Sequence, residues 1–94
     1  MKVNFKKLQI TAVNGLPLLN DTGKDVCIDV SKEVGNYIYM ETSDLGELDL
    51  AQRIYKEGEV ELTDEEIQIV GNYIRKGFKA VIQKAYNDVT GYGK

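Results

Sequence analysis

The sequence predicts an α+β fold in which an N-terminal antiparallel β-ribbon packs against two or three helices, the C-terminal one long. Apolar and polar residues alternate over much of 1–30, a pattern typical of strands with one buried face. Apolar residues instead recur every three or four positions over 63–88, which is the repeat of a helix. A chain of 94 residues can bury one modest core, so we expect a single domain over 1–94, with 89–94 as a frayed tail.

The first 30 residues are expected to form the β-ribbon. Apolar residues stand at odd positions up to Phe5 and at even positions from Leu8. The first strand, 3–13, therefore contains a bulge or is partly buried on both faces. Regular alternation over 25–30 predicts the second strand, antiparallel to the first. Because two strands alone are marginally stable, a helix must cover the ribbon.

Residues 31–58 are expected to form short helices. Ser31 has a side chain suited to an N-cap, so it would precede the first helical turn. The aromatic content of 34–42 leaves both a helical and an extended conformation open for that stretch. Apolar residues recur at helical spacing over 45–55, and Gly58 stands where a helix commonly ends at a glycine. We therefore expect a second helix that ends at Gly58.

Residues 63–88 give the strongest helical signal. Thr63 and Glu66 match a capping box, in which each side chain accepts a hydrogen bond from the other residue's backbone N–H. The apolar stripe that follows predicts one continuous helix of about six turns. Gly71 and Gly77 interrupt it at a cost of about 1 kcal/mol each relative to alanine. They indicate either close approach of a neighbouring element or a mild kink.

The composition removes the residues on which most enzymes depend. The chain has no histidine, so it lacks the commonest base and metal ligand at neutral pH. Its single cysteine, Cys27, has no imidazole to activate it and cannot form an internal disulfide or a thiolate zinc site. We therefore expect no catalytic residue, no metal ligand and no cofactor. No apolar run has the length of a membrane span or a signal peptide, which favours a cytoplasmic protein.

Charge is distributed unevenly along the chain. Residues 41–66 hold ten acidic side chains against two basic ones, whereas 67–94 are mainly basic. An acidic balance argues against a duplex DNA binder, which would usually be basic overall. One alternative is an acidic inhibitor of a host defence or nucleic-acid enzyme, which requires the ten acids to share one face and imitate a phosphate backbone. Pairing of acidic with basic patches, or covering of free strand edges, would instead give a homo-oligomer.

Six tyrosines in a chain without tryptophan suggest a protein-binding surface. Tyrosine combines a large apolar ring with a polar tip and is enriched at interfaces, although it also completes cores. A small-ligand binder is a further alternative, and it requires a concave pocket that contains a carboxylate of raised pKa. For a protein partner, the surface predicted from the sequence combines aromatic residues with nearby acids: Tyr37, Tyr39, Tyr55, Glu57, Glu59 and Glu61.

The order of motifs over residues 30–74 also carries a resemblance. A strand-rich start is followed by the pattern LA-x-x-IY at Leu50–Tyr55 and by ELT-x-EEI at Glu61–Ile67. This order resembles small proteins encoded in bacteriophage and prophage genomes. Those proteins have no established activity, so the resemblance transfers no functional residue. It implies the cytoplasm of a bacterial host and a non-catalytic accessory role, and we therefore expect a protein that acts by binding or assembly.

Overall fold

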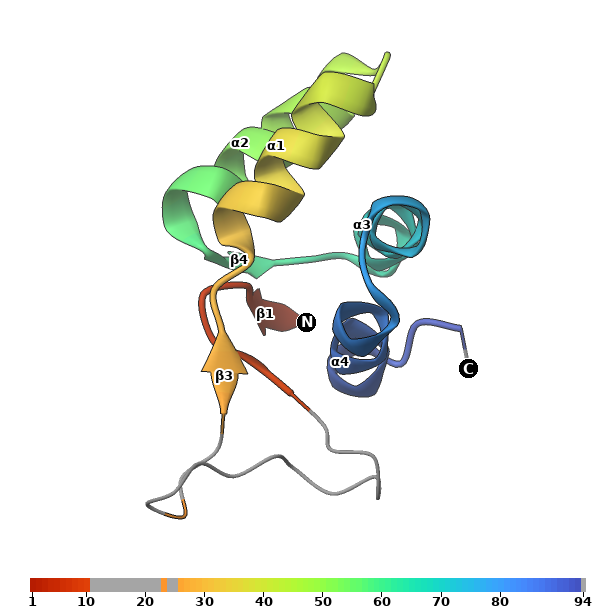
Figure 1. The fold of residues 1–94 in the computed structure, drawn as a ribbon. Coiled ribbons are helices and arrows are strands. Elements are labelled where there is room, and N and C mark those ends of the chain that lie inside the picture. The colour runs from red at the N-terminus through yellow and green to blue at the C-terminus, as the bar shows by residue number, and fades with distance from the viewer. Residues whose placement is uncertain (11–22, 24–25, 94) are drawn as a thin grey trace.

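The computed structural model describes residues 1–10, 23 and 26–93 and confirms the α+β class (Figure 1). Helices α1 and α2 form a hairpin that projects from a body made of the strands, α3 and α4 (Figure 1). No helix in the described part of the chain combines the length and apolarity needed to cross a membrane. In chain order the elements are β1 (Lys2–Asn4), β2 (Leu8–Gln9), β3 (Cys27–Ile28), α1 (Ser31–Glu41), α2 (Leu45–Glu57), β4 (Glu59–Glu61), α3 (Asp64–Gly77) and α4 (Ala80–Thr90).

Two small antiparallel ribbons replace the single ribbon that the sequence predicts. β1 pairs with β4, and β2 pairs with β3. The chain changes partner at a turn over 5–7, where the Asn4 carbonyl accepts a hydrogen bond from the Lys7 N–H at 3.3 Å. This turn, and not a bulge within one strand, explains why the buried positions shift from odd to even numbers. The parts of the predicted strands at 11–13 and 25 lie outside the described residues.

The backbone of Phe5 holds both ends of the helical hairpin. Its N–H donates to the carbonyl of Gly58, directly after α2, at 2.8 Å. Its carbonyl accepts from the N–H of Val30, directly before α1, also at 2.8 Å. Gly58 ends α2 with φ +74°, a conformation that favours glycine, so the predicted C-terminal glycine of this helix is confirmed.

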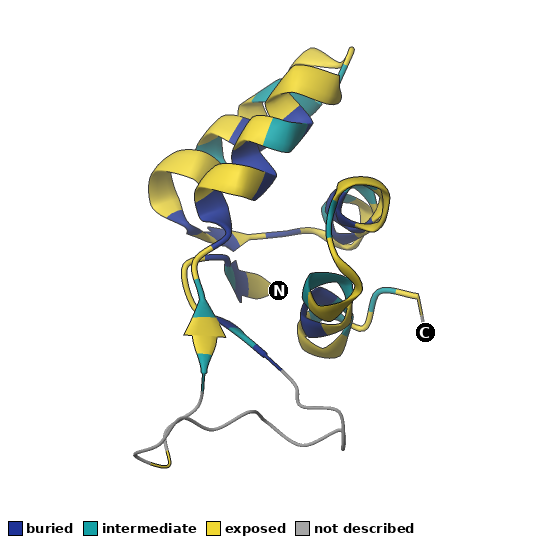
Figure 2. Cartoon of the chain, in the orientation of Figure 1, coloured by how far each residue is buried: buried dark blue, intermediate teal, exposed yellow. Residues whose placement is uncertain are grey.

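The core lies where the ribbons meet the inner faces of the helices (Figure 2). The Tyr86 side chain of α4 is fully buried, and its ring stacks on Phe5 with centroids 6.2 Å apart. Its hydroxyl donates to the Ile67 carbonyl of α3 at 2.7 Å, so its polar tip is satisfied. Burial raises the pKa of this hydroxyl. Around this pair, each element contributes apolar side chains that include Val3, Leu8, Val34, Ile38, Leu50, Ile54, Val60, Val70 and Ile74.

The start of α1 differs from the prediction. Ser31 is the first residue of the helix, and Val30, which has no capping side chain, stands at the N-cap. The Asp29 carboxylate accepts instead from the Ser31 hydroxyl at 2.7 Å and from its backbone N–H at 3.0 Å. These two hydrogen bonds, the hydroxyl's first, lower the pKa of Asp29. The predicted N-cap at Ser31 is therefore wrong. The sequence left the conformation of residues 34–42 open, and this stretch is helical through Glu41.

The long helix predicted over 63–88 is two helices. Phe78 and Lys79 adopt extended backbone conformations and separate α3 from α4. The Gln83 side-chain amide donates to the Phe78 carbonyl at 2.8 Å and satisfies a group that the break frees. Both helices bury apolar residues against the same core. The apolar repeat in the sequence therefore continues across the break and does not indicate where α3 ends. The predicted tail also begins within α4, which extends to Thr90.

The two glycines of α3 mark close contacts, one of the two explanations that the sequence left open. A Cβ atom at Gly77 would lie 2.5 Å from the Tyr37 ring. A Cβ atom at Gly71 would collide with the ring of Tyr92, whose hydroxyl donates to the Asn72 side chain at 2.5 Å. Tyr92 therefore packs onto α3, although the sequence predicted fraying around it.

Candidate functional site

The candidate site lies on the helical hairpin, where α1 and α2 pack in close contact. A Cβ atom at Gly35 would lie 2.8 Å from the Tyr55 Cβ atom and 2.9 Å from the Ala51 carbonyl oxygen. Only glycine permits this approach, because real Cβ atoms do not sit so close to backbone. The small residues at this crossing leave a depression beside them.

A hollow of about 170 Å³ occupies that depression. Gly35 and Ala51 are buried at its base, while Tyr39 and Tyr55 remain 45% and 42% exposed. We call the side of the hairpin that carries the hollow the outer flank. The lining residues are Gly35, Asn36, Tyr39, Ala51, Gln52, Tyr55 and Lys56.

Further apolar side chains extend the outer flank toward the tip of the hairpin. Met40 is 76% exposed and lies one helical turn beyond Asn36, on the same side of α1. Leu45 is 83% exposed and lies two turns before Gln52, on the same side of α2. Of the seven large apolar residues that are exposed in the described part of the chain, four therefore share this flank. Such a concentration differs from single apolar residues scattered over a surface.

Tyr37 lies on the opposite side of α1, which we call the inner flank. Two residues along a helix correspond to a rotation of about 200°, so Tyr37 and Tyr39 point in nearly opposite directions. The Tyr37 ring makes edge contacts with Tyr73 and Phe78 at centroid distances of 6.2 and 5.7 Å. The structure therefore brings Tyr39 and Tyr55 together and places Tyr37 in the packing between α1 and α3.

The inner flank also holds a polar contact between the hairpin and α3. The Glu47 carboxylate accepts from the Thr42 hydroxyl at 2.8 Å and from the Tyr73 hydroxyl at 2.7 Å. Burial raises the pKa of Tyr73, and the neighbouring carboxylate adds to the effect. Glu47 therefore faces α3 and does not line the hollow.

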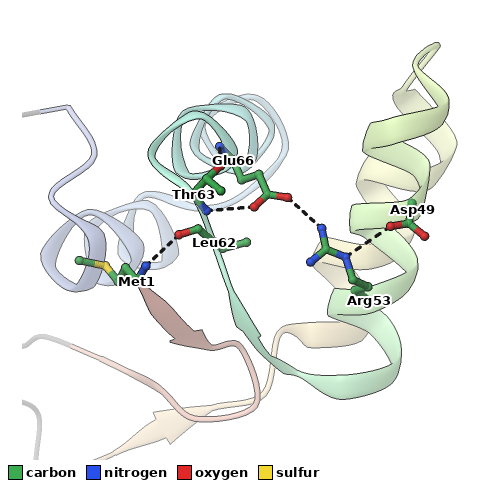
Figure 3. A network of polar contacts seen from close by, with 6 residues as sticks. All are labelled: Met1, Asp49, Arg53, Leu62, Thr63 and Glu66. Carbon is green, nitrogen blue, oxygen red and sulfur yellow. Dashed lines mark hydrogen bonds and ion pairs between the residues drawn. The ribbon is translucent and has the colours of Figure 1, made fainter.

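A second polar network joins α2 to the start of α3 (Figure 3). The Arg53 guanidinium donates to Glu66 at 2.8 Å, and its Nε atom lies 3.4 Å from the Asp49 carboxylate. Glu66 also accepts from the Thr63 N–H at 2.9 Å while its own N–H donates to the Thr63 hydroxyl at 3.1 Å, so the capping box is confirmed. The Thr63 N–H, and then Arg53, lower the pKa of Glu66. The Arg53–Glu66 ion pair therefore joins the hairpin to α3, whereas the Asp49–Arg53 pair lies within α2.

The three acids of the predicted partner surface lie at the base of the hairpin. Glu57 is the last residue of α2, and Glu59 and Glu61 are exposed on β4. Glu61 accepts from the Met1 amine at 3.2 Å. The same amine donates to the Leu62 carbonyl at 2.8 Å (Figure 3). Glu59 lies 4.0 Å from the Lys2 ammonium. None of the three lines the hollow.

The acids of residues 41–66 are spread over the hairpin, β4 and the first turn of α3. Asp44, which accepts from the Gly46 N–H at 3.1 Å, and Glu57 stand at opposite ends of α2, about 20 Å apart at 1.5 Å per residue. Across the described residues, no three carboxylate or thiol groups lie together as a metal site would require. Cys27 is exposed on β3 and belongs to no such group.

Several residues of the outer flank were not predicted from the sequence. Asn36, Gln52 and Lys56 are polar residues with no distinguishing motif, and Met40 and Leu45 looked like ordinary apolar positions. The small pair Gly35 and Ala51 was the available signal, because small residues permit close helix crossing. No protein-family model, curated protein or solved structure significantly matches the chain.

Proposed function

We propose that this chain is a non-catalytic protein-binding or assembly protein, and that the outer flank of its helical hairpin is the docking surface. The hollow between Tyr39 and Tyr55 carries this proposal, because it combines a concave apolar site with exposed aromatic rings. Tyrosines in such positions often provide most of the binding energy of a protein interface. Met40 and Leu45 add apolar area beside the hollow.

The size of the hollow favours a protein partner over a small ligand. Sites for small molecules usually measure about 300–1,000 Å³, whereas this one measures about 170 Å³. It suits a single large apolar side chain inserted from a partner. The small-ligand alternative requires a carboxylate of raised pKa in the pocket. The lining of this hollow contains no carboxylate. The resemblance to phage and prophage proteins supports an accessory role in a bacterial cytoplasm.

A peptide-display selection tests this function. A library of random 16-residue peptides is selected on the full chain, and the recovered peptides are measured against the double variant Tyr39→Ser/Tyr55→Ser. We expect peptides with one large apolar residue whose affinity falls about tenfold or more in this variant, as loss of interface anchors predicts. Both tyrosines are half exposed, so the variant should remain folded, which circular dichroism verifies.

The matched control is Val81→Ser/Val89→Ser. It removes two side chains of similar exposure, 43% and 42%, from α4. Peptide affinity should be unchanged in this control. If no recovered peptide distinguishes the tyrosine variant from the control, the outer flank is not a docking surface and the proposal fails.

A further inference from the structure

The charges of the outer flank indicate which kind of partner fits it. Lys56 is the only charged residue in the lining of the hollow, and it forms no salt bridge with any residue that the structure describes. Lys32 is exposed and lies one turn before Asn36, so it shares the same flank, toward the base of the hairpin. Glu33 is exposed three residues before Asn36 and offsets Lys32, so the positive charge at the hollow itself is that of Lys56, in a chain of net charge −3.

None of the acids of α2 lines the hollow. Glu47 accepts the Tyr73 hydroxyl on the inner flank, and Asp49 lies against Arg53. The outer flank is consequently apolar toward its tip, at Met40 and Leu45, and carries the Lys56 ammonium toward its base. A partner that matches both ends must bring apolar and acidic groups in a fixed order.

We infer that the outer flank binds an acidic amphipathic helix of another protein; this inference rests on the function proposed above. One large apolar side chain of that helix fills the hollow between Tyr39 and Tyr55. A carboxylate three or four residues away pairs with Lys56, since residues at that spacing lie about 5–6 Å apart on one helix face. Laying an amphipathic helix into a groove is a recurrent mode of peptide recognition. The ion pair selects the partner and its direction along the groove.

A second copy of this chain fits the flank less well. A twofold dimer is isologous, so the same surface meets itself. The hollow of one copy would then meet a flank whose lining again supplies only a lysine, Lys56, as its charged residue. The lysine charges would remain uncompensated at the hollow, whereas an acidic helix neutralises them.

The test uses the peptides recovered by the selection on the full chain. We expect aspartate or glutamate to be enriched three or four positions from the apolar anchor. For the tightest such peptide, fluorescence anisotropy should show affinity reduced about tenfold by Lys56→Glu and by raising the salt concentration. Replacing the peptide's acid with lysine should restore affinity for Lys56→Glu and reduce it for the wild type. Lys79→Glu, which makes the same charge change at the break between α3 and α4, is the control and should have no effect.

Three other outcomes would overturn the inference, and they are distinguishable. If peptide binding requires Tyr39 and Tyr55 but is indifferent to Lys56→Glu, the docking surface stands and the acidic partner is wrong. If no peptide depends on the tyrosines, the proposed function itself fails. If light scattering shows a dimer of the wild type that Tyr39→Ser/Tyr55→Ser dissociates, the occupant is a second copy.

Discussion

Tyr37 and Tyr39 belong to the same turn of α1, yet the structure gives them opposite environments. Tyr37 contacts Tyr73, Phe78 and the backbone at Gly77, so its ring helps to join the hairpin to α3. Tyr39 lines a hollow at the surface. The difference teaches that tyrosine enrichment alone does not identify a binding surface. What identifies it is which rings remain exposed after the helices have packed.

The strongest test of this comparison replaces each ring separately. Tyr37→Ala should lower the free energy of unfolding by about 2–3 kcal/mol, somewhat less than the loss for a fully buried aromatic ring. Tyr39→Ala should change it by no more than about 0.5 kcal/mol, as for most surface substitutions. Urea denaturation measures both. Equal losses would show that the inner and outer flanks do not differ as the structure indicates.

The second test concerns the crossing that separates the flanks. Gly35→Val places a branched side chain against the Tyr55 Cβ atom and the Ala51 carbonyl, so α1 and α2 must move apart. We expect a loss of about 1–3 kcal/mol in unfolding free energy, typical of overpacking. The control is Gly46→Ala, whose new Cβ atom would meet only Asp44 at 3.7 Å. It should be neutral or stabilising by up to about 1 kcal/mol. A tolerated valine would refute the close crossing.

The smallest expected effect concerns the network that joins α2 to α3. Thr63→Ala should lower the free energy of unfolding by about 1 kcal/mol, the usual value of a lost N-cap.

The folded-state pKa of Glu66 is lowered. Its contribution to the free energy of unfolding is therefore fully present above its ordinary pKa of 4.5 and is lost as pH falls through the folded value. Glu66→Gln should remove this part of the acid sensitivity, measured as the urea midpoint between neutral and acidic pH. Glu65→Gln, an exposed neighbour in the same turn, should retain it.

Two local signals in the sequence predicted helix ends correctly, whereas a third, the N-cap at Ser31, was wrong. The capping box at Thr63 and the terminal glycine at Gly58 were identified because each depends on contacts within a few residues. The pairing of β1 with β4 could not be predicted, because strands of three residues carry too little pattern to specify a distant partner. The break at Phe78 was hidden by an apolar repeat that serves the same core on both sides.

The candidate site was only partly predictable for a related reason. Tyr39 and Tyr55, two of the residues chosen from the sequence, both line the hollow. Tyr37 was grouped with them on aromatic enrichment, while the stretch around it was left open between an extended and a helical conformation. In a strand, residues two apart share a face, whereas in a helix they point to opposite sides. The conformation of that turn therefore decides the composition of the site.

The position of Phe5 has a consequence for binding. Its backbone hydrogen bonds to Gly58 and Val30 hold both ends of the hairpin at one residue, and its ring stacks on the buried Tyr86. Contacts of Tyr37, Glu47 and Arg53 with α3 hold the hairpin at further points. A partner that docks on the outer flank, as proposed, would therefore meet a surface that needs little ordering, and would lose little affinity to that cost.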